Sequence, residues 1–192
     1  MLWFAPVIAF TQSSTVMPSE LPPTPISSWD VRSGDSLIVD TKMNEGYLVH
    51  QDGGYLAFPV VTGQRRVVRY IGRTYNAATP TGSWSTLSKE TKGDHITFGR
   101  NGTFFRLFRD KDDETAYGIH SHAYADTMLA KEERFRSMGC IIVSEQILEV
   151  IGLTFELSGQ KMAVVTTFGI PQASVTYPAL QQMIATISQK DL

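Results

Sequence analysis

The sequence predicts a mainly β domain, a sandwich-like mixed β structure with a few short helices. Three observations predict this class: short β-rich runs, glycine- and asparagine-containing turns between them, and helical spacing confined to the C-terminal part. The β-rich runs are residues 36–40, 46–50, 55–61, 95–98, 103–108, 116–120 and 161–168. Because the first three runs are separated by short turn sequences, we expect them to form a meander of hairpins.

Helical spacing begins after Ser144, which can cap a segment that carries Ile147, Leu148 and Ile151. A second helical segment is expected in residues 171–192 as a C-terminal extension. Residues 1–28 combine a short apolar stretch with a proline- and serine-rich linker. The stretch is long enough for the core of an export signal but lacks a basic region before it, so we interpret it as a signal remnant or as an apolar arm. The folded domain is expected at residues 29–170.

The composition is that of one globular domain. The chain has 192 residues and a mass of 21.3 kDa, with 42% hydrophobic and 19% charged residues. It contains no apolar run of the roughly 20 residues needed to span a membrane. The net charge of -2 and the pI near 6.1 leave no basic excess for a phosphate backbone. We therefore expect a monomer without nucleic-acid partners or a membrane span.

The single cysteine, Cys140, follows Ser137-Met138-Gly139. A cysteine nucleophile needs a base or cation that generates the thiolate and donors for the oxyanion. Gly139 allows a tight turn, so the amides of Met138, Gly139 and Cys140 can converge beside the sulfur, and the Ser137 side chain can hold that turn. The alternative is an inert buried thiol.

His120 ends an apolar β-rich run and suits the role of general base. If that strand continues, His122 points to the same face, so a substitute base or a metal pair with Asp126 is an alternative. No second thiolate and no HExxH spacing supports a metal, and we expect none. We interpret His50 and His95 as solvated strand residues without a catalytic role.

Two segments, Gly118-Ile119-His120-Ser121 and Ser137-Met138-Gly139-Cys140-Ile141-Ile142-Val143-Ser144, together resemble the active-site signature of the L,D-transpeptidase catalytic domain, the YkuD-type family. Segments upstream resemble the same family in the same order. They include residues 35–40, 47–49, 58–63 and 78–84, so that the likeness covers about residues 35–152.

The resemblance implies a thiol acyl-transfer enzyme that acts on peptidoglycan stem peptides outside the cytoplasm, in the periplasm or cell wall. Cys140 would attack the third stem residue and form a thioester, which an amine acceptor converts into a 3→3 cross-link. His120 would be the base, Ser121 would orient it through its backbone carbonyl, and Gly139 and Met138 would frame the oxyanion hole. No metal or organic cofactor is implied.

Two residues depart from the family pattern. Met138 replaces a histidine before Gly-Cys, and Ile142 replaces an arginine or asparagine that would suit a substrate carboxylate. His122 and Arg136 are candidate replacements, although Arg136 also fits a surface charge. The expected substrate-binding residues are Met138, Ser137, His122, Arg136 and Tyr117. Residues 123–136 are expected to form a loop or short helix that acts as a lid.

The departures leave two alternatives open. An L,D-carboxypeptidase of the same scaffold would use water as the acceptor. A non-catalytic wall-binding module would keep the fold without the reaction.

Overall fold

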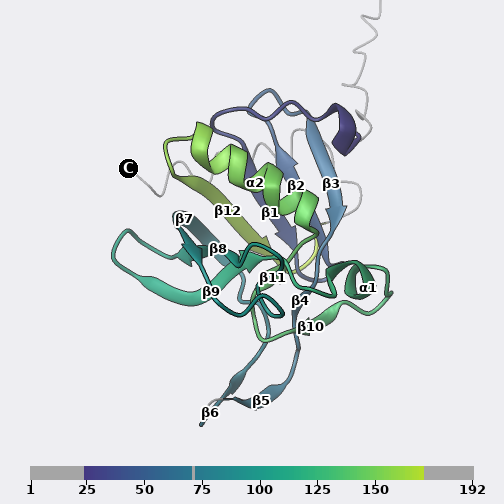
Figure 1. Cartoon of the computed structure of the whole chain (residues 1–192), viewed down its shortest axis with the longest axis vertical. Helices are drawn as coiled ribbons and strands as arrows, with labels where there is room; N and C mark the ends of the chain where they lie inside the picture. Colours follow the sequence, from purple (N-terminus) through teal and green to yellow (C-terminus); the bar gives the residue numbers. More distant parts are fainter. Residues whose placement is uncertain (1–23, 71, 171–192) are drawn as a thin grey trace, which may run out of the picture.

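An eight-stranded mixed sheet forms the body of the protein (Figure 1). The structure is a computed structural model that describes residues 24–70 and 72–170. The strand order in the sheet is β11-β9-β8-β7-β12-β1-β2-β3. These strands are β1 (Ser36–Asp40), β2 (Glu45–Val49), β3 (Tyr55–Pro59), β7 (Gly82–Thr91), β8 (Thr103–Phe108), β9 (Glu114–His120), β11 (Ile141–Ile142) and β12 (Met162–Thr167).

Strand β1 lies inside the sheet and is buried on both faces. It pairs antiparallel with β2 and parallel with β12. Leu37 and Val39 belong to the main hydrophobic core, whereas Ile38 belongs to a second apolar cluster that includes Val49. This explains why the run is apolar almost throughout, since a strand covered on both faces does not alternate with polar residues.

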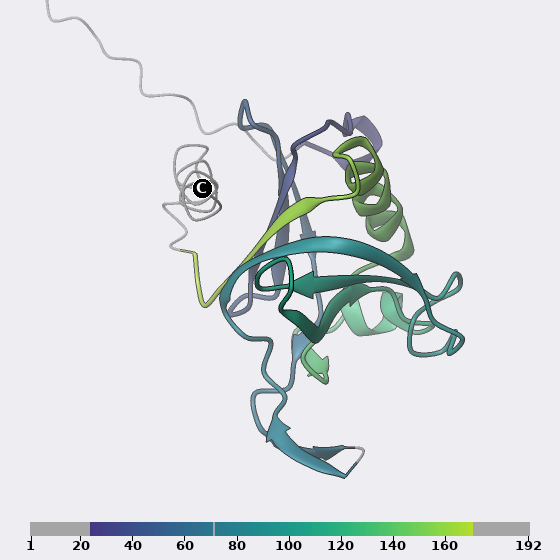
Figure 2. The ribbon, with the colours of Figure 1, turned by 90° about the vertical axis from the view of Figure 1, so that its left-hand side faces the viewer.

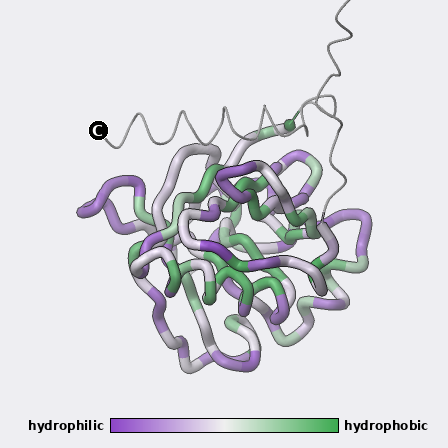
Figure 3. The backbone as a smooth tube through the Cα atoms, turned by 90° about the horizontal axis from the view of Figure 1, so that it is seen from above, coloured by the Kyte–Doolittle hydropathy of each residue, from purple (hydrophilic) through white to green (hydrophobic). Residues whose placement is uncertain are grey.

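Helix α2 (Glu145–Leu157) covers one face of the sheet (Figure 2). Ser144 caps it, because its Oγ accepts a hydrogen bond from Ile147 N at 3.2 Å. Ile147 and Ile151 pack in the same core as Phe105 and Ile119 of the sheet. Hydrophobic segments accordingly gather in the middle of the tube in Figure 3 and hydrophilic ones occupy outer loops.

Two small sheets lie outside the main sheet. The hairpin of β5 (Val67–Tyr70) and β6 (Arg73–Asn76) projects from the body (Figures 1 and 2). Strand β10 (Phe135–Ser137) pairs parallel with β4 (Thr62–Gly63), directly before the Cys140 turn. The remaining elements are the 3-10 helix η1 (Ile26–Ser28) and helix α1 (Ala125–Leu129).

The predicted mainly β class is confirmed, and so are six of the seven predicted strand regions and the capped helix. Residues 95–98 are the exception, since they form turns in which Asp94 Oδ1 accepts hydrogen bonds from Ile96 N and Thr97 N. The longest strand, β7, was not predicted, because serine and threonine replace the apolar residues that identify strands.

The expected signal remnant or arm lies mostly outside the described residues, as does the expected C-terminal helix. Of the helices in residues 24–70 and 72–170, none has the length and apolar character needed to cross a membrane.

Candidate active site

Cys140 and His120 lie on the same face of the sheet. Strand β11 pairs parallel with β9, with Ile141 opposite Ile119 and Ile142 opposite His120. Ile119 and Ile141 are fully buried in the core beneath α2. Because side chains alternate along a strand, Cys140 and His120 point away from that core. Cys140 directly precedes β11 and His120 ends β9, so the register of these two strands makes the two residues diagonal neighbours.

The turn before Cys140 requires its glycine for two reasons. Gly139 has a φ of 119°, and a Cβ at this position would lie 2.6 Å from the Tyr117 ring. Ser137 holds the turn, since its Oγ donates to Cys140 O at 2.6 Å and accepts from Gly139 N at 3.1 Å. These are the side-chain hydrogen bonds expected of Ser137.

The second hydrogen bond changes the expected oxyanion hole. The amide of Gly139 is engaged by Ser137 Oγ and does not point freely toward the sulfur. The amides of Met138 and Cys140 remain as the candidate donors for an oxyanion. Gly139 thus shapes the turn, whereas its neighbours supply the candidate N–H groups.

Two residues that the sequence reasoning missed attach this turn to the body. Thr79 Oγ1 accepts a hydrogen bond from Gly63 N at 2.8 Å and donates to Gly139 O at 2.9 Å. Tyr75 of the projecting hairpin donates from its hydroxyl to Met138 O at 3.2 Å. Thr79 belongs to the Thr-Pro-Thr-Gly segment. The resemblance of that segment to the family was the sequence signal that could have identified Thr79.

His120 is held in one orientation at the end of β9. Its Nδ1 lies 2.6 Å from Ser121 O, the contact expected for Ser121. A carbonyl oxygen only accepts, so in the neutral ring Nδ1 carries the proton and Nε2 carries the lone pair of a base. The ring packs against Phe98 and Phe104 and is 3% exposed. Burial lowers the pKa of His120, against the opposing effect of hydrogen bonds to backbone groups of Ser121 and Thr97.

The Ser121 hydroxyl does not orient the His120 ring. Its Oγ is buried and has no hydrogen-bond partner among the described residues. The orienting contact therefore comes from the backbone of Ser121.

The surroundings of Cys140 favour its protonated thiol over the thiolate. Burial raises its pKa to about 11, while the backbone of Gly118 and the charge of Arg106 act in the opposite direction. The sulfur lies 4.0 Å from Ala116 O, and within the described part of the chain it has no hydrogen bond to His120. A thiol with a raised pKa beside an imidazole with a lowered pKa forms a neutral pair.

His122 does not continue the strand, because β9 ends at His120. Its Nδ1 accepts a hydrogen bond from Tyr124 N at 3.0 Å, and its ring packs on the Tyr124 ring. The expectation that His122 shares the face of His120 required the strand to continue to residue 122, and it does not. The expectation that His50 is solvated was also wrong, since this residue is 5% exposed and bonds Asp35 Oδ1 at 2.7 Å.

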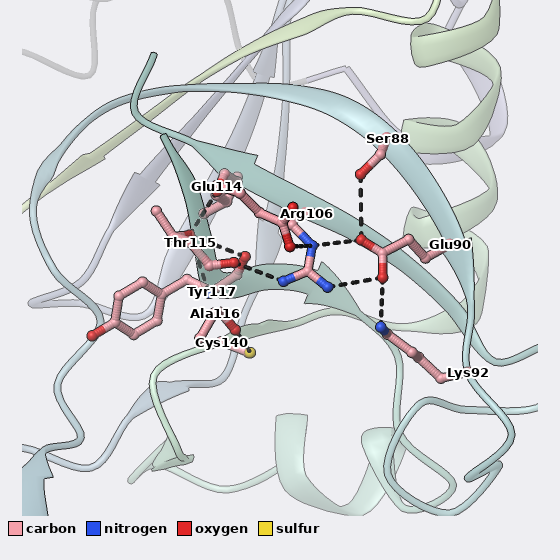
Figure 4. A network of polar contacts seen from close by, with 10 residues as sticks. Ser88, Glu90, Lys92, Arg106, Glu114, Thr115, Ala116, Tyr117 and Cys140 are labelled. Atoms are coloured by element: carbon pink, nitrogen blue, oxygen red, sulfur yellow. Dashed lines mark hydrogen bonds and ion pairs between the residues drawn. The ribbon is translucent and has the colours of Figure 1, made fainter. Parts of the chain in front are cut away.

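Arg136 is exposed and lines a cavity of about 660 Å³ together with Gln64, Arg65, Arg66, Glu133 and Phe135. Among the described residues, the cation whose charge lowers the pKa of the Cys140 thiol is Arg106 of β8, which the sequence reasoning missed. Figure 4 shows Arg106 within a polar network, with Cys140 beside Ala116. Tyr117 points its ring away from this network (Figure 4).

Residues 123–136 include helix α1, in agreement with the expected loop or short helix. Ala125 of this helix packs in a small apolar cluster with Val61 and Ile142, and Met128 and Leu129 pack against it. Ile142 thus supports α1 and brings no charge to the site. Met138 is partly buried, with its sulfur 3.5 Å from Gln64 Nε2.

Comparisons with known proteins agree with this fold. The family model of the L,D-transpeptidase catalytic domain (YkuD) matches residues 34–154. Bd1075 of Bdellovibrio bacteriovorus is 12% identical, with 84% of this chain and 58% of that chain covered and a TM-score of 0.51. An L,D-transpeptidase of Xylanimonas cellulosilytica is 17% identical, with 77% and 65% covered and a TM-score of 0.48.

The helical cell shape determining protein Pgp2 of Campylobacter jejuni is 16% identical, with 82% of this chain and 56% of that chain covered and a TM-score of 0.49. The chain thus spans 56 to 65% of the length of these three structures. At 12 to 17% identity, the similarity to these structures is a similarity of fold alone. No curated protein matches the chain.

Proposed function

The chain belongs to the L,D-transpeptidase catalytic domain family, and we propose on this premise that it is a cysteine acyl-transfer enzyme acting on peptidoglycan stem peptides. The observation that supports the proposal most directly is that Cys140 and His120 lie on one face of the sheet, at the adjacent ends of β11 and β9. The turn at Gly139 and the backbone contact of His120 support it further, since both positions are held by hydrogen bonds.

In the first half of the reaction, Cys140 Sγ attacks the carbonyl carbon of the third stem residue. His120 Nε2 takes the thiol proton as the S–C bond forms, and the developing oxyanion accepts hydrogen bonds from the amides of Met138 and Cys140. The C–N bond then breaks, the leaving amine receives the proton from His120, and a thioester remains on Cys140.

In the second half, the side-chain amine of another stem attacks the thioester carbonyl. His120 removes a proton from this amine, the S–C bond breaks, and the thiolate regains that proton. The product is a 3→3 cross-link. Because this substrate lies in the cell wall, we assign the activity to the periplasm or cell wall.

The neutral state of the pair decides how the first step begins. The raised pKa of Cys140 and the lowered pKa of His120 both disfavour a resting thiolate with an imidazolium. Proton transfer to His120 therefore accompanies attack on the substrate, which is general-base catalysis. The contact between Cys140 and Ala116 must give way to one with His120, as is common when an apo site binds substrate.

Hydrolysis by water is the second candidate. Ile142 is buried against α1 and Met138 supplies a thioether, so neither residue offers a charge for holding an acceptor stem. An L,D-carboxypeptidase would form the same thioester and release a shortened stem.

The test is to incubate the purified protein with disaccharide tetrapeptide and to identify the products by mass spectrometry. Cross-linked dimers are expected, tripeptide alone would assign the carboxypeptidase, and Cys140→Ala should abolish either product. If no product forms and a carbapenem leaves no adduct on Cys140, the proposal is wrong and the fold serves as a wall-binding module.

A further inference from the structure

Strand β8 is flanked by an irregularity on each side, and both occur at Arg106. On one side, the pairing with β7 shifts between Thr86 and Ser88. On the other, it shifts between Arg106 and Phe108, so that residues 115–117 of β9 lie opposite Leu107 alone and β9 has two extra residues there. Bulges of this kind redirect side chains and are frequent beside active sites.

The bulge in β9 connects Arg106 to the cysteine site. Thr115 Oγ1 donates to Leu107 O at 2.6 Å, and Thr115 O accepts from Arg106 Nη1 at 2.7 Å. The next residue, Ala116, presents its carbonyl oxygen to Cys140 Sγ at 4.0 Å. Adjacent carbonyls of one bulge thus contact the guanidinium and the thiol.

Arg106 is held firmly in this place. Glu90 accepts from its Nε and Nη2 at 2.5 and 2.9 Å, which is a bidentate pair, and the Arg106 side chain is only 16% exposed. Glu90 also accepts from Lys92 Nζ at 2.5 Å (Figure 4). The pKa of Glu90 is lowered to about 2, chiefly by the Arg106 hydrogen bonds, so that this carboxylate is ionised at neutral pH.

The guanidinium keeps donors for a further ligand. Three of its N–H groups go to Glu90 and Thr115, which leaves one N–H on each Nη without a hydrogen-bond acceptor among the described residues. Lys92 likewise has more donors than its single hydrogen bond to Glu90 uses. Two cations share the partly buried carboxylate of Glu90, whose side chain is 27% exposed, while the other carboxylate near Arg106, Glu114, is 62% exposed.

The position of Arg106 relative to Cys140 suits a small anion. Arg106 lies opposite Gly118 of β9, and the β11 register puts Cys140 next to Gly118 on the other side. The two backbones are therefore roughly 10 Å apart, a gap that the arginine side chain partly spans. Gly118 has no side chain of its own, and the Phe104 ring lies directly over it, so this ring forms one wall of the gap.

We propose that Arg106, assisted by Lys92, forms a carboxylate subsite beside Cys140 that receives the C-terminal carboxylate of the donor stem. The inference rests on the proposed function for the identity of the donor. In a tetrapeptide the leaving residue carries a free carboxylate about 4 Å from the attacked carbonyl carbon. A planar guanidinium fork matches a carboxylate, and such a subsite selects stems that end one residue after the cleaved bond.

The first test uses the chain's only cysteine and needs no turnover. Cys140 is alkylated with iodoacetate, which carries a carboxylate, and with neutral iodoacetamide. The same thiolate attacks both reagents and displaces iodide. A change in the pKa of the thiol therefore alters both rates equally and leaves their ratio unchanged. We expect Arg106→Gln to lower the iodoacetate to iodoacetamide ratio about fivefold or more, and Arg106→Lys to retain part of it.

Two further variants make this test specific. Arg109→Gln removes an exposed cation that follows the same strand, so its ratio should match the wild type. The double variant Arg106→Gln with Glu90→Gln removes both charges of the ion pair. It replaces Arg106→Gln in the alkylation test if the single variant does not fold. An unchanged ratio in a folded Arg106 variant would overturn the subsite.

The second test compares turnover of tetrapeptide with that of its C-terminal amide. The wild type should prefer the free acid, and Arg106→Gln should lose this preference mainly through KM. Turnover with equal use of acid and amide would overturn the subsite while leaving the proposed function standing. If the wild type turns over neither substrate, the proposed function fails, and the alkylation ratio still decides whether Arg106 binds carboxylates.

Discussion

Replacement of Thr79 by valine would test how the Cys140 turn is attached to the sheet. Thr79 is 7% exposed, and its hydroxyl bridges Gly63 N and Gly139 O at 2.8 and 2.9 Å. Valine has nearly the same shape but no hydroxyl. The substitution therefore removes both hydrogen bonds without creating a large cavity.

The expected cost follows from the two groups left behind. Gly63 and Gly139 are both buried, and each unsatisfied backbone group costs about 1 to 3 kcal/mol. We expect Thr79→Val to lower the free energy of unfolding by roughly 2 to 6 kcal/mol. Thr79→Ser keeps the hydroxyl and should lose about 0.8 kcal/mol, the contribution of one methyl group.

Urea denaturation followed by tryptophan fluorescence measures this difference, because Trp84 is buried in the core. The same variants show whether the turn controls the thiol. A loosened turn exposes Cys140 to water, which relieves the burial that raises its pKa, so alkylation by iodoacetamide at pH 7 should become faster. If Thr79→Val is as stable as Thr79→Ser and its thiol reacts at the wild-type rate, the bridge does not hold the turn.

Three further outcomes are expected. Cys140→Ala should abolish turnover but change the free energy of unfolding by less than about 1 kcal/mol, because the residue is only partly buried; a loss of several kcal/mol in urea denaturation would instead indicate a packed core thiol. His120→Ala should slow alkylation of Cys140 by iodoacetamide, and equal rates would remove His120 from the mechanism. The lowered pKa of His120 means that the unfolded chain takes up a proton as the pH falls below about 6.5, whereas the folded protein does not, so stability decreases with falling pH. Urea denaturation at pH 7.5 and 5.5 should show a smaller decrease for His120→Ala, and the same decrease in both proteins would contradict the assignment.

The pair of Cys140 and His120 could be predicted from the sequence because local patterns mark both residues. A strand that ends in histidine and a glycine before cysteine each identify their own segment. The contacts of Ser137 within the turn span three residues or fewer, so they too followed from local chemistry. The capped helix α2 was predictable for the same reason.

Arg106 could not be assigned in this way. Its strand was predicted, but an arginine in an alternating strand ordinarily faces solvent. Its place beside Cys140 depends on the pairing of β7, β8 and β9 and on two shifts of register, and no local pattern encodes either. Arg136 was the nearer cation in sequence, yet its Nε donates to Glu133 O and its exposed side chain lines the cavity beside Gln64.

The charge states around Cys140 limit how the proposed acylation can begin. Arg106 stabilises a thiolate, and a carboxylate bound to Arg106 would cancel part of that effect. The donor stem that fits the proposed subsite therefore makes a free thiolate less favourable, which leaves proton transfer to His120 during attack as the workable route. Acylation should accordingly be slower in deuterium oxide, as measured by single-turnover mass spectrometry at matched pH and pD. Equal rates in the two solvents would indicate that the thiolate forms before attack and that His120 acts only in its formation.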